Sequence, residues 1–371
     1  MKKQSLQQLA NKIEKASKSL RHDNGLYSAS AGEHYISFVW LRDLYMQTVD
    51  IPKEDYLQSW STFLDYAVTC EDKYKKFTTI IEEGRSAKPF HIRWCTKTND
   101  EIEHEWGHQQ NDSWGMALMA IAEEGEALLQ NEDYKEVVKL ILLALNSSEF
   151  WTAQDCGAWE ENFEHRQSSI ACAASGVYDI APYYPELSEM TNHMIEESKW
   201  VIEDFGTNET PTRSADLAQL HGVWFGVPRK VMSLNQGKKI IRNVEKNLLR
   251  RNGVARYKRD EFYNINLRLT LDKYNGVFNP QAEGEIVGGE AEWVFGFPTL
   301  MLARKSCGME VPEYYIKRMK DIALHNNGVI PELYYAKTNI CNDNRPLGWS
   351  CNLFRIVMTE YLEFGKITPL A

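Results

Sequence analysis

Apolar residues recur at steps of three and four positions along most of the chain, the spacing that places them on one face of an α-helix. The first such stripe consists of Leu6, Leu9, Ile13, Ala16 and Leu20. Stripes of this kind predict twelve helices, over residues 3–20, 39–49, 53–69, 111–129, 132–146, 167–180, 186–205, 213–225, 235–251, 290–307, 311–325 and 348–364.

Two stretches interrupt the helical pattern, residues 71–110 and 252–289. The second alternates polar with aromatic or aliphatic residues, so we expect short strands there. Long loops in a compact domain are usually functional or disordered, and the Trp, Arg, Tyr and Asp residues in these two favour function. Because no linker divides the predicted helices, we expect one all-α domain of paired helices over residues 1–371.

The 371 residues include 42 basic and 52 acidic side chains, a formal net charge of −10. A negative surface argues against a nucleic-acid partner and fits a neutral or cationic small molecule, or a polymer without phosphates. No run of about 18 apolar residues predicts a membrane span, and the charged N-terminal segment does not resemble a secretory signal. The seven cysteines, odd in number and without a CxxC pair, indicate reduced thiols and a cytoplasmic protein.

Five clusters of polar and aromatic residues lie before the predicted helices or at their starts. They are VWLRD with Trp40, Arg42 and Asp43; EWGHQQND with Trp106, Gln110, Asn111 and Asp112; GAWEENFEH with Trp159, Glu160 and Glu161; ARYKRDEFY with Arg256, Tyr257 and Asp260; and VIPELYY with Glu332, Tyr334 and Tyr335. The clusters precede the second, fourth, sixth, tenth and twelfth predicted helices. If the helices alternate between an outer and an inner position around a ring, these connections share one mouth.

Carboxylates gathered at one mouth suggest acid and base catalysis. Glycoside hydrolysis needs a proton donor for the leaving oxygen and a second carboxylate, which stands roughly 6.5–9.5 Å away in an inverting enzyme. Glu160 is the candidate donor, because Trp159 desolvates it and Glu161 adds a like charge, and both effects favour a protonated carboxyl. Glu332 is the candidate base.

A sugar ring presents vicinal hydroxyls, which need both donors and acceptors. Arg42 donates in a fork and Asp43 accepts, so the two suit such hydroxyls. The hydroxyls of Tyr334 and Tyr335 could hold the Glu332 carboxylate or a water molecule.

Each cluster also has a purely structural interpretation. Trp159 and the two acids after it could be a packed aromatic residue beside solvated carboxylates. Arg42 and Asp43 could form an ion pair and a helix cap. The residues 110–112 could be an ordinary helix start, and Glu332 a surface turn acid. Only the joint placement of the clusters favours a site.

The segment HEWGH spells the H-E-x-x-H pattern with His104, Glu105 and His108. This pattern binds zinc when both histidines lie one turn apart on a helix. Here Gly107 lies inside the pattern, the next helix is predicted to start only at residue 111, and no later cluster offers a third ligand. We therefore expect no metal, and a zinc hydrolase remains an alternative hypothesis.

Taken together, six sequence motifs in chain order resemble those of glycoside hydrolase family 15, the glucoamylase family. They are VWLRDLYM at 39–46, EWGHQQNDSWG at 105–115, GAWEEN at 157–162, GVARYKRDEFY at 253–263, EAEWVFGFPTLMLA at 290–303, and PELYYAKTN followed by PLGWS, which ends at residue 350. Within the family, the chain looks closest to the glucoamylase-like domain of phosphorylase kinase regulatory subunits.

The resemblance implies a six-hairpin (α/α)6 barrel and metal-independent, inverting exo-hydrolysis of α-glucosidic bonds, with a small oligosaccharide as substrate. It implies that Glu160 is the general acid and Glu332 the general base. The implied substrate-binding residues are Trp40, Arg42, Asp43, Trp106, Gln110, Asn111, Asp112, Trp159, Glu161, Arg256, Trp293 and Trp349.

The chain departs from the family pattern in two ways. It has no room for the N-terminal β-sandwich of many bacterial members, and the base word reads PELYY where SEQYD or EEYD is more usual. A catalytically silent sugar-binding or regulatory module on the same fold is therefore the main alternative. The sequence predicts neither the sugar, the linkage and the chain length nor the oligomeric state.

Overall fold

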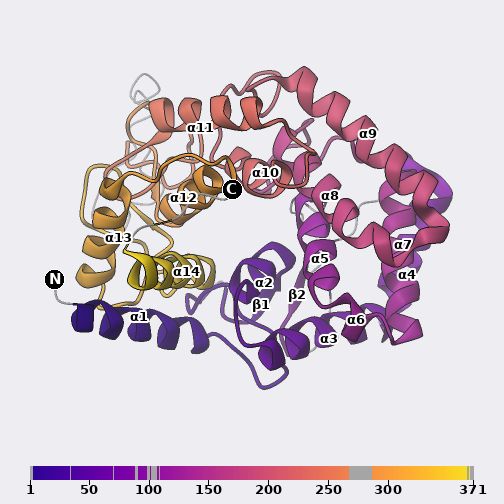
Figure 1. Ribbon diagram of the computed structural model, residues 1–371, viewed down its shortest axis with the longest axis horizontal. Coiled ribbons are helices and arrows are strands. Elements are labelled where there is room, and N and C mark those ends of the chain that lie inside the picture. Colours follow the sequence, from indigo (N-terminus) through magenta and orange to yellow (C-terminus); the bar gives the residue numbers. More distant parts are fainter. Residues whose placement is uncertain are drawn as a thin grey trace.

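Six helices stand around a common centre in the computed structural model and form a closed inner ring (Figure 1). They are α2 (Leu41–Thr48), α5 (Asn111–Glu123), α8 (Gln167–Ile180), α10 (Gln219–Gly226), α12 (Gly296–Ser306) and α14 (Gly348–Phe364). Each contacts the next, and α14 returns to contact α2. The structure describes residues 3–33, 35–69, 71–87, 91–97, 101, 107, 109–266, 286–365 and 367.

A second set of helices surrounds the inner ring (Figure 1). It consists of α1 (Lys3–Lys18), α3 (Lys53–Thr69), α4 (Glu71–Glu83), α7 (Glu132–Ser147), α9 (Ser188–Phe205), α11 (Leu234–Leu248) and α13 (Glu313–His325). Apart from the successive outer helices α3 and α4, the chain alternates between outer and inner positions, which confirms the predicted (α/α)6 barrel. The short helix α6 (Gly125–Leu128) and the 3-10 turns η1 (Gly84–Ser86), η2 (Ala181–Tyr183) and η3 (Pro185–Leu187) lie in the connections.

Burial explains why the chain alternates in this way. The outer helix α11 buries one stripe, formed by Ile240, Ile241, Val244 and Leu248, as a surface helix does. The inner helices α5 and α8 are apolar on nearly all sides and are buried along most of their length. A Cβ atom at Gly115 would lie 2.2 Å from the carbonyl oxygen of Cys172, so this glycine lets the two inner helices meet backbone to backbone.

Two short antiparallel sheets fasten the connections that lead into inner helices. Strand β1 (Phe38–Trp40) pairs with β2 (Arg93–Cys95), so that Trp40 lies opposite Arg93 just before α2. Strand β3 (Glu292–Trp293) pairs with β4 (Leu333–Tyr334) and joins the connection before α12 to the one before α14. The strands therefore fix the positions of residues at the barrel mouth.

The predicted helices 53–69, 167–180 and 348–364 agree with the structure. The stretch 71–110 was predicted without a helix, but it contains α4, whose Phe77 and Ile80 are buried although most of the segment is polar. The predicted helix 290–307 begins instead with β3, and its helical part starts at residue 296.

The connection over 252–289 holds only single bridges in its described part, such as the one between Val254 and Trp293. The short strands predicted there are not present at 252–266, and residues 267–285 lie outside the described residues. None of the described helices combines the length and the apolar character that a membrane crossing requires.

Candidate active site

A cavity of about 1170 Å³ opens at the end of the barrel where the chain enters the inner helices. Residues from all six of these connections line it, from Tyr35 before α2 to Leu347 before α14. Three of the five predicted clusters contribute several lining residues, the second contributes Gly107 and the fifth contributes Glu332. The shared mouth that the sequence predicted is therefore present. The sixth connection, before α10, contributes Arg213, a residue that the sequence analysis did not select.

Glu160 lines the cavity from the connection before α8. Its backbone has a φ of 59°, in the left-handed region that few residues other than glycine adopt. A turn fixes it there, because its N–H donates to the carbonyl oxygen of Gly157 at 3.1 Å. One carboxylate oxygen lies 3.6 Å from Nη2 of Arg42, and the side chain is 11% exposed, so the group is shielded but open to the cavity.

Glu332 lines the same cavity from the connection before α14. Its carbonyl oxygen accepts from the N–H of Val294, next to the short sheet of β3 and β4. Its Oε2 accepts hydrogen bonds from the side-chain amides of Asn342 and Asn344, both at 2.6 Å. Burial raises the pKa of Glu332, while the two amides and then the charge of Arg256 act in the opposite direction.

Of the two tyrosines that the sequence suggested as partners of Glu332, Tyr334 makes a different contact. The hydroxyl of Tyr334 accepts a hydrogen bond from Asn326 at 2.5 Å instead. Tyr35, which the sequence analysis missed, also lines the cavity. The charge of Glu332, followed by burial, raises the pKa of Tyr35, so its hydroxyl stays protonated near this carboxylate.

Arg42 is buried at the start of α2, and two residues on the side away from the cavity hold its guanidinium. Nη1 donates to Oε1 of Gln110 at 2.9 Å and to Oδ2 of Asp112 at 3.0 Å. Nη2 faces Glu160. Asp43 also lines the cavity; burial raises its pKa to about 7, Arg42 opposes this, and the charges of the two cavity glutamates add to it.

The residues 110–112 were predicted to bind substrate, but none of them lines this cavity. Gln110 and Asp112 lie behind Arg42 and orient it. Asn111 lines a separate pocket of about 430 Å³, and its backbone N–H donates to Oδ2 of Asp155 at 2.9 Å. The sequence placed these residues at the correct helix start, but the direction of each side chain depends on packing that the sequence does not reveal.

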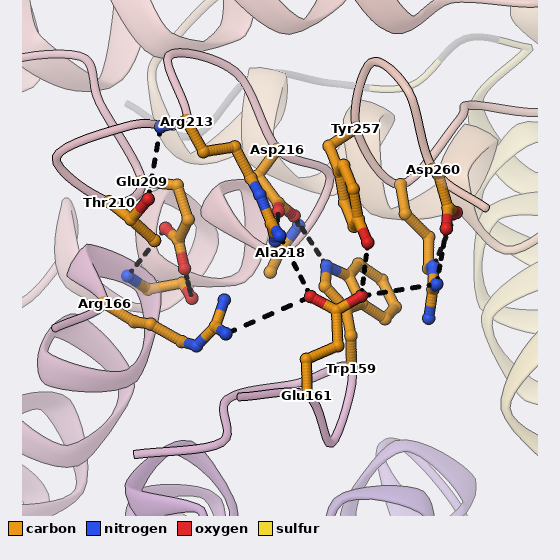
Figure 2. Close-up of polar contacts among 12 residues, drawn as sticks. Trp159, Glu161, Arg166, Glu209, Thr210, Arg213, Asp216, Ala218, Tyr257 and Asp260 are labelled. Atoms are coloured by element: carbon orange, nitrogen blue, oxygen red, sulfur yellow. Dashed lines mark hydrogen bonds and ion pairs between the residues drawn. The ribbon is translucent and has the colours of Figure 1, made fainter. Parts of the chain in front are cut away.

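Glu161, the neighbour of Glu160, is held by several groups (Figure 2). Its Oε1 accepts from the hydroxyl of Tyr257 at 2.5 Å and lies 3.4 Å from Arg256. Its Oε2 accepts from Arg213 at 3.0 Å. Burial alone would raise the pKa of Glu161, but Arg256, the hydroxyl and Arg213 outweigh it and lower this pKa. Glu161 is therefore an ionised, fixed carboxylate.

Two further ion pairs support this part of the wall (Figure 2). Asp260 accepts from Nε and Nη2 of Arg256 at 2.7 and 2.6 Å, a bidentate pair. Asp216 accepts from Arg213 at 2.9 Å and from the indole N–H of Trp159 at 2.8 Å. The second pair lies in the connection before α10. Because this connection also leads from an outer to an inner helix, the predicted alternation of helices could have indicated it as the sixth segment that lines the cavity.

Aromatic side chains form the remaining wall. Trp40, Trp159, Trp293 and Trp349 line the cavity as predicted, together with Phe295, which was not predicted. The rings of Phe295 and Trp349 stack with their centres 4.1 Å apart. Aromatic faces with a few polar groups between them are typical of sites that bind small molecules.

Several predicted residues lie outside the described part of the chain. They are His104, Glu105, Trp106 and His108. Among the described residues, no group of His, Cys, Asp and Glu is arranged to hold a metal ion.

The model of the family described as Glycosyl hydrolases family 15 matches residues 3–210, more than half of the chain. None of the curated proteins matches. Among solved structures, a glycosidase variant in complex with glucose has a TM-score of 0.73 at 15% identity, over 98% of this chain and 99% of that one. The glucoamylase of Hormoconis resinae has a TM-score of 0.61 at 12% identity, over 99% and 74%. That of Saccharomycopsis fibuligera has 0.59 at 12%, over 98% and 97%. These likenesses support the fold.

Proposed function

The chain belongs to glycosyl hydrolases family 15, and from this premise we propose that it is an inverting, exo-acting hydrolase that releases glucose from α-linked oligosaccharides. The family prediction is confirmed, and membership implies a carbohydrate substrate. Glucose bound to a glycosidase of the same fold supports glucose as the sugar released here. The closer resemblance to phosphorylase kinase regulatory subunits stays a prediction.

The observation that carries the proposal is that Glu160 and Glu332 line one cavity in unlike surroundings. An inverting hydrolase needs two carboxyl groups with opposite protonation states on either side of the scissile bond. The family match ends at residue 210, so it includes Glu160 but not Glu332. The assignment of Glu332 therefore depends on its place in the cavity and on the resemblance of PELYY to the family's base motif.

Glu160 is the proposed general acid because its neighbour is unsuited to the role. Glu161 is ionised and accepts bonds on both oxygens, so it has no proton to give and no freedom to approach a leaving group. Glu160 faces the cavity, and one of its carboxylate oxygens lies 3.6 Å from Nη2 of Arg42. In the proposed role, its proton passes to the glycosidic oxygen as the bond from that oxygen to the anomeric carbon breaks.

Glu332 is the proposed general base. Both amides bind the same oxygen, Oε2, which fixes the carboxylate plane. Among the residues that the structure describes, none donates a hydrogen bond to Oε1, so this oxygen is available to a water molecule. The water gives its proton to Glu332 as its oxygen attacks the anomeric carbon from the face opposite the leaving group, which inverts the configuration.

The rest of the wall suits a terminal sugar ring. Arg42 and Asp43 offer a donor and an acceptor to vicinal hydroxyls, and Trp40, Trp293 and Trp349 offer apolar faces to the C–H faces of the ring. A ring held by these groups presents its anomeric carbon to the two glutamates.

The configuration of the first product tests the proposal. We expect the protein to release glucose from at least one of maltose, isomaltose and trehalose. With maltose or isomaltose, proton NMR during the first minutes should show β-glucose ahead of α-glucose, whereas trehalose should give one β-glucose for each α-glucose, because the leaving unit keeps its configuration. Release of α-glucose first would contradict inversion. Saturable sugar binding without any product, measured by calorimetry on the same panel, would instead identify a catalytically silent sugar-binding module.

A further inference from the structure

The connection between α9 and α10 places an ion pair between the two residues that flank Glu160 (Figure 2). Nη1 of Arg213 donates to Oδ2 of Asp216 at 2.9 Å. Nη2 of the same guanidinium donates to Glu161 at 3.0 Å, and Oδ1 of Asp216 accepts from the indole N–H of Trp159 at 2.8 Å. One pair of side chains thus holds both the residue before Glu160 and the residue after it.

The pair is itself firmly anchored. Asp216 is fully buried, and its Oδ1 also accepts from the backbone N–H of Ala218 at 2.8 Å, at the start of α10. The guanidinium of Arg213 lies 3.5 Å from the centre of the Tyr257 ring, which restricts it from one side. A displacement of Trp159 or of Glu161 would therefore break its contact with a pair that is fixed to the start of α10 and to the ring of Tyr257.

Glu160 needs such support because its backbone is strained. A non-glycine residue at positive φ is energetically unfavourable, and it persists only where the surroundings fix it. The turn bond to Gly157 fixes its N–H side. The contacts of Arg213 and Asp216 fix the side chains on both sides of it, and these contacts come from a different connection.

We infer that Arg213 and Asp216 are positioning residues, which aim the carboxyl of Glu160 at the leaving oxygen by clamping Trp159 and Glu161. The inference rests on the proposed function, because it requires Glu160 to act as the general acid. Neither residue is required to touch the scissile bond. Their loss should therefore impair proton donation more than it impairs the attack by water.

Two substrates with different needs for an acid test this inference. The first is maltose, or the disaccharide of the panel that is hydrolysed fastest, whose leaving oxygen must be protonated. The second is α-glucosyl fluoride, from which fluoride leaves with little help from an acid. We expect Asp216→Asn to lower kcat on the disaccharide by roughly 10- to 100-fold, a large part of the contribution of a general acid. The loss on the fluoride should be only a few-fold, and KM for both should change little.

Arg213→Gln provides a second variant in case the buried Asp216 change prevents folding, because Arg213 is partly exposed. It should show the same selectivity between substrates, and Arg213→Lys, which can keep only one of the two contacts, should show a smaller loss. The alkaline limb of kcat against pH, which reports the acid, should move in both variants while the acidic limb stays in place. Circular dichroism and the melting temperature verify the fold.

The pair Arg229 and Asp179 is a matched control. It is a bidentate ion pair with Nε–Oδ distances of 2.8 Å, and Arg229 is exposed about as much as Arg213, although Asp179 is less buried than Asp216; neither residue of the control pair lines the cavity. Asp179→Asn should leave the ratio of the two activities unchanged. Equal losses on both substrates in the Asp216 and Arg213 variants, or no loss, would overturn the positioning role while the hydrolase stands. A wild-type protein without turnover on either substrate would overturn both proposals.

Discussion

The side-chain amide of Asn344 donates a hydrogen bond of 2.6 Å to Glu332, and it binds the same oxygen that Asn342 binds. Two neutral donors on one carboxylate stabilise its charged form. They oppose the burial that raises the pKa of Glu332. In the proposed mechanism this carboxylate has to be ionised, so the two amides extend activity toward lower pH.

Replacing Asn344 by alanine should therefore move the acidic limb of kcat/KM to higher pH. The sign follows from the cause: removal of a donor raises the pKa of Glu332 further, so the base becomes protonated, and activity is lost, earlier on acidification. The measurement is kcat/KM against pH for the wild type and the variant.

Asn326→Ala is the control for this prediction. Asn326 donates to the hydroxyl of Tyr334, two residues from Glu332, and does not line the cavity. Its acidic limb should coincide with that of the wild type. A profile of Asn344→Ala that does the same would show that the amide has no influence on the base.

The two adjacent acids of the AWEEN word should respond differently to the same substitution. Glu160→Gln removes the proposed proton donor, so kcat should fall by roughly 10²- to 10⁴-fold with little change in KM. Glu161→Gln weakens the contact by which Arg213 holds the residue after Glu160, so kcat should also fall, but by less than in Glu160→Gln, because the proton donor itself is kept.

Steady-state kinetics on a disaccharide and calorimetry with glucose distinguish the two variants. Glucose should still bind to Glu160→Gln with an affinity near that of the wild type. If Glu161→Gln showed the larger loss of kcat and Glu160→Gln kept its rate, the assignment of the acid would have to be exchanged between the two neighbours.

Gln110 and Asp112 should affect catalysis only through Arg42. Arg42→Lys loses the forked geometry and should lower kcat/KM by roughly 10- to 100-fold, the value of one or two hydrogen bonds to a charged group. Gln110→Ala should cause a smaller loss, because Asp112 still holds the guanidinium.

A double-mutant cycle measures whether Gln110 acts through Arg42. Once Arg42 is lysine, the contact at 2.9 Å to Gln110 no longer exists in its original form. The second substitution should then cost less than it does in the wild type. Strictly additive losses would mean that Gln110 contacts the substrate itself, as the sequence analysis first suggested.

The helices that were predicted well are those with broad apolar faces. The segments 167–180 and 348–364 are buried over most of their lengths, so their apolar residues mark them clearly. Helix α4 was missed because a polar segment hides the few residues that it buries, such as Phe77. A narrow stripe of this kind becomes recognisable only when the neighbouring helix α7 is in place.

The site was predictable where its residues form a recognisable sequence motif. It was not predictable where a residue's role depends on partners that are far away in the sequence. Trp159, Glu160 and Glu161 are adjacent in the sequence, so they were selected together. Which of the two acids is held ionised depends on Arg213 and Arg256, which reach Glu161 from two other connections. Nothing in the segment around Arg213 has the aromatic and polar character that marked the other clusters.

Asp155 lies beneath the mouth, and it should make the stability of the fold depend on pH. Its Oδ2 accepts from the N–H of Asn111 at the start of α5. Burial, with the charge of Asp112 as a second cause, raises the pKa of Asp155 to about 7. An unfolded aspartate titrates near about 4. Between these two values the folded chain keeps a proton that the unfolded chain has released. The free energy of unfolding therefore falls as the pH rises through this window and is constant above it.

Asp155→Asn removes this titration and keeps an oxygen that can accept from the N–H of Asn111. The shift in pKa corresponds to on the order of 4 kcal/mol across the window, as an upper bound. The variant should thus gain stability relative to the wild type between pH 5 and pH 8, when urea denaturation is measured at constant ionic strength. Asp204→Asn, a change of an exposed carboxylate in α9, is the control and should leave the pH dependence unaltered. If the Asp155 variant and the wild type instead give parallel curves, Asp155 is ionised in the folded chain, and the cost of burying its charge is met by its hydrogen bonds.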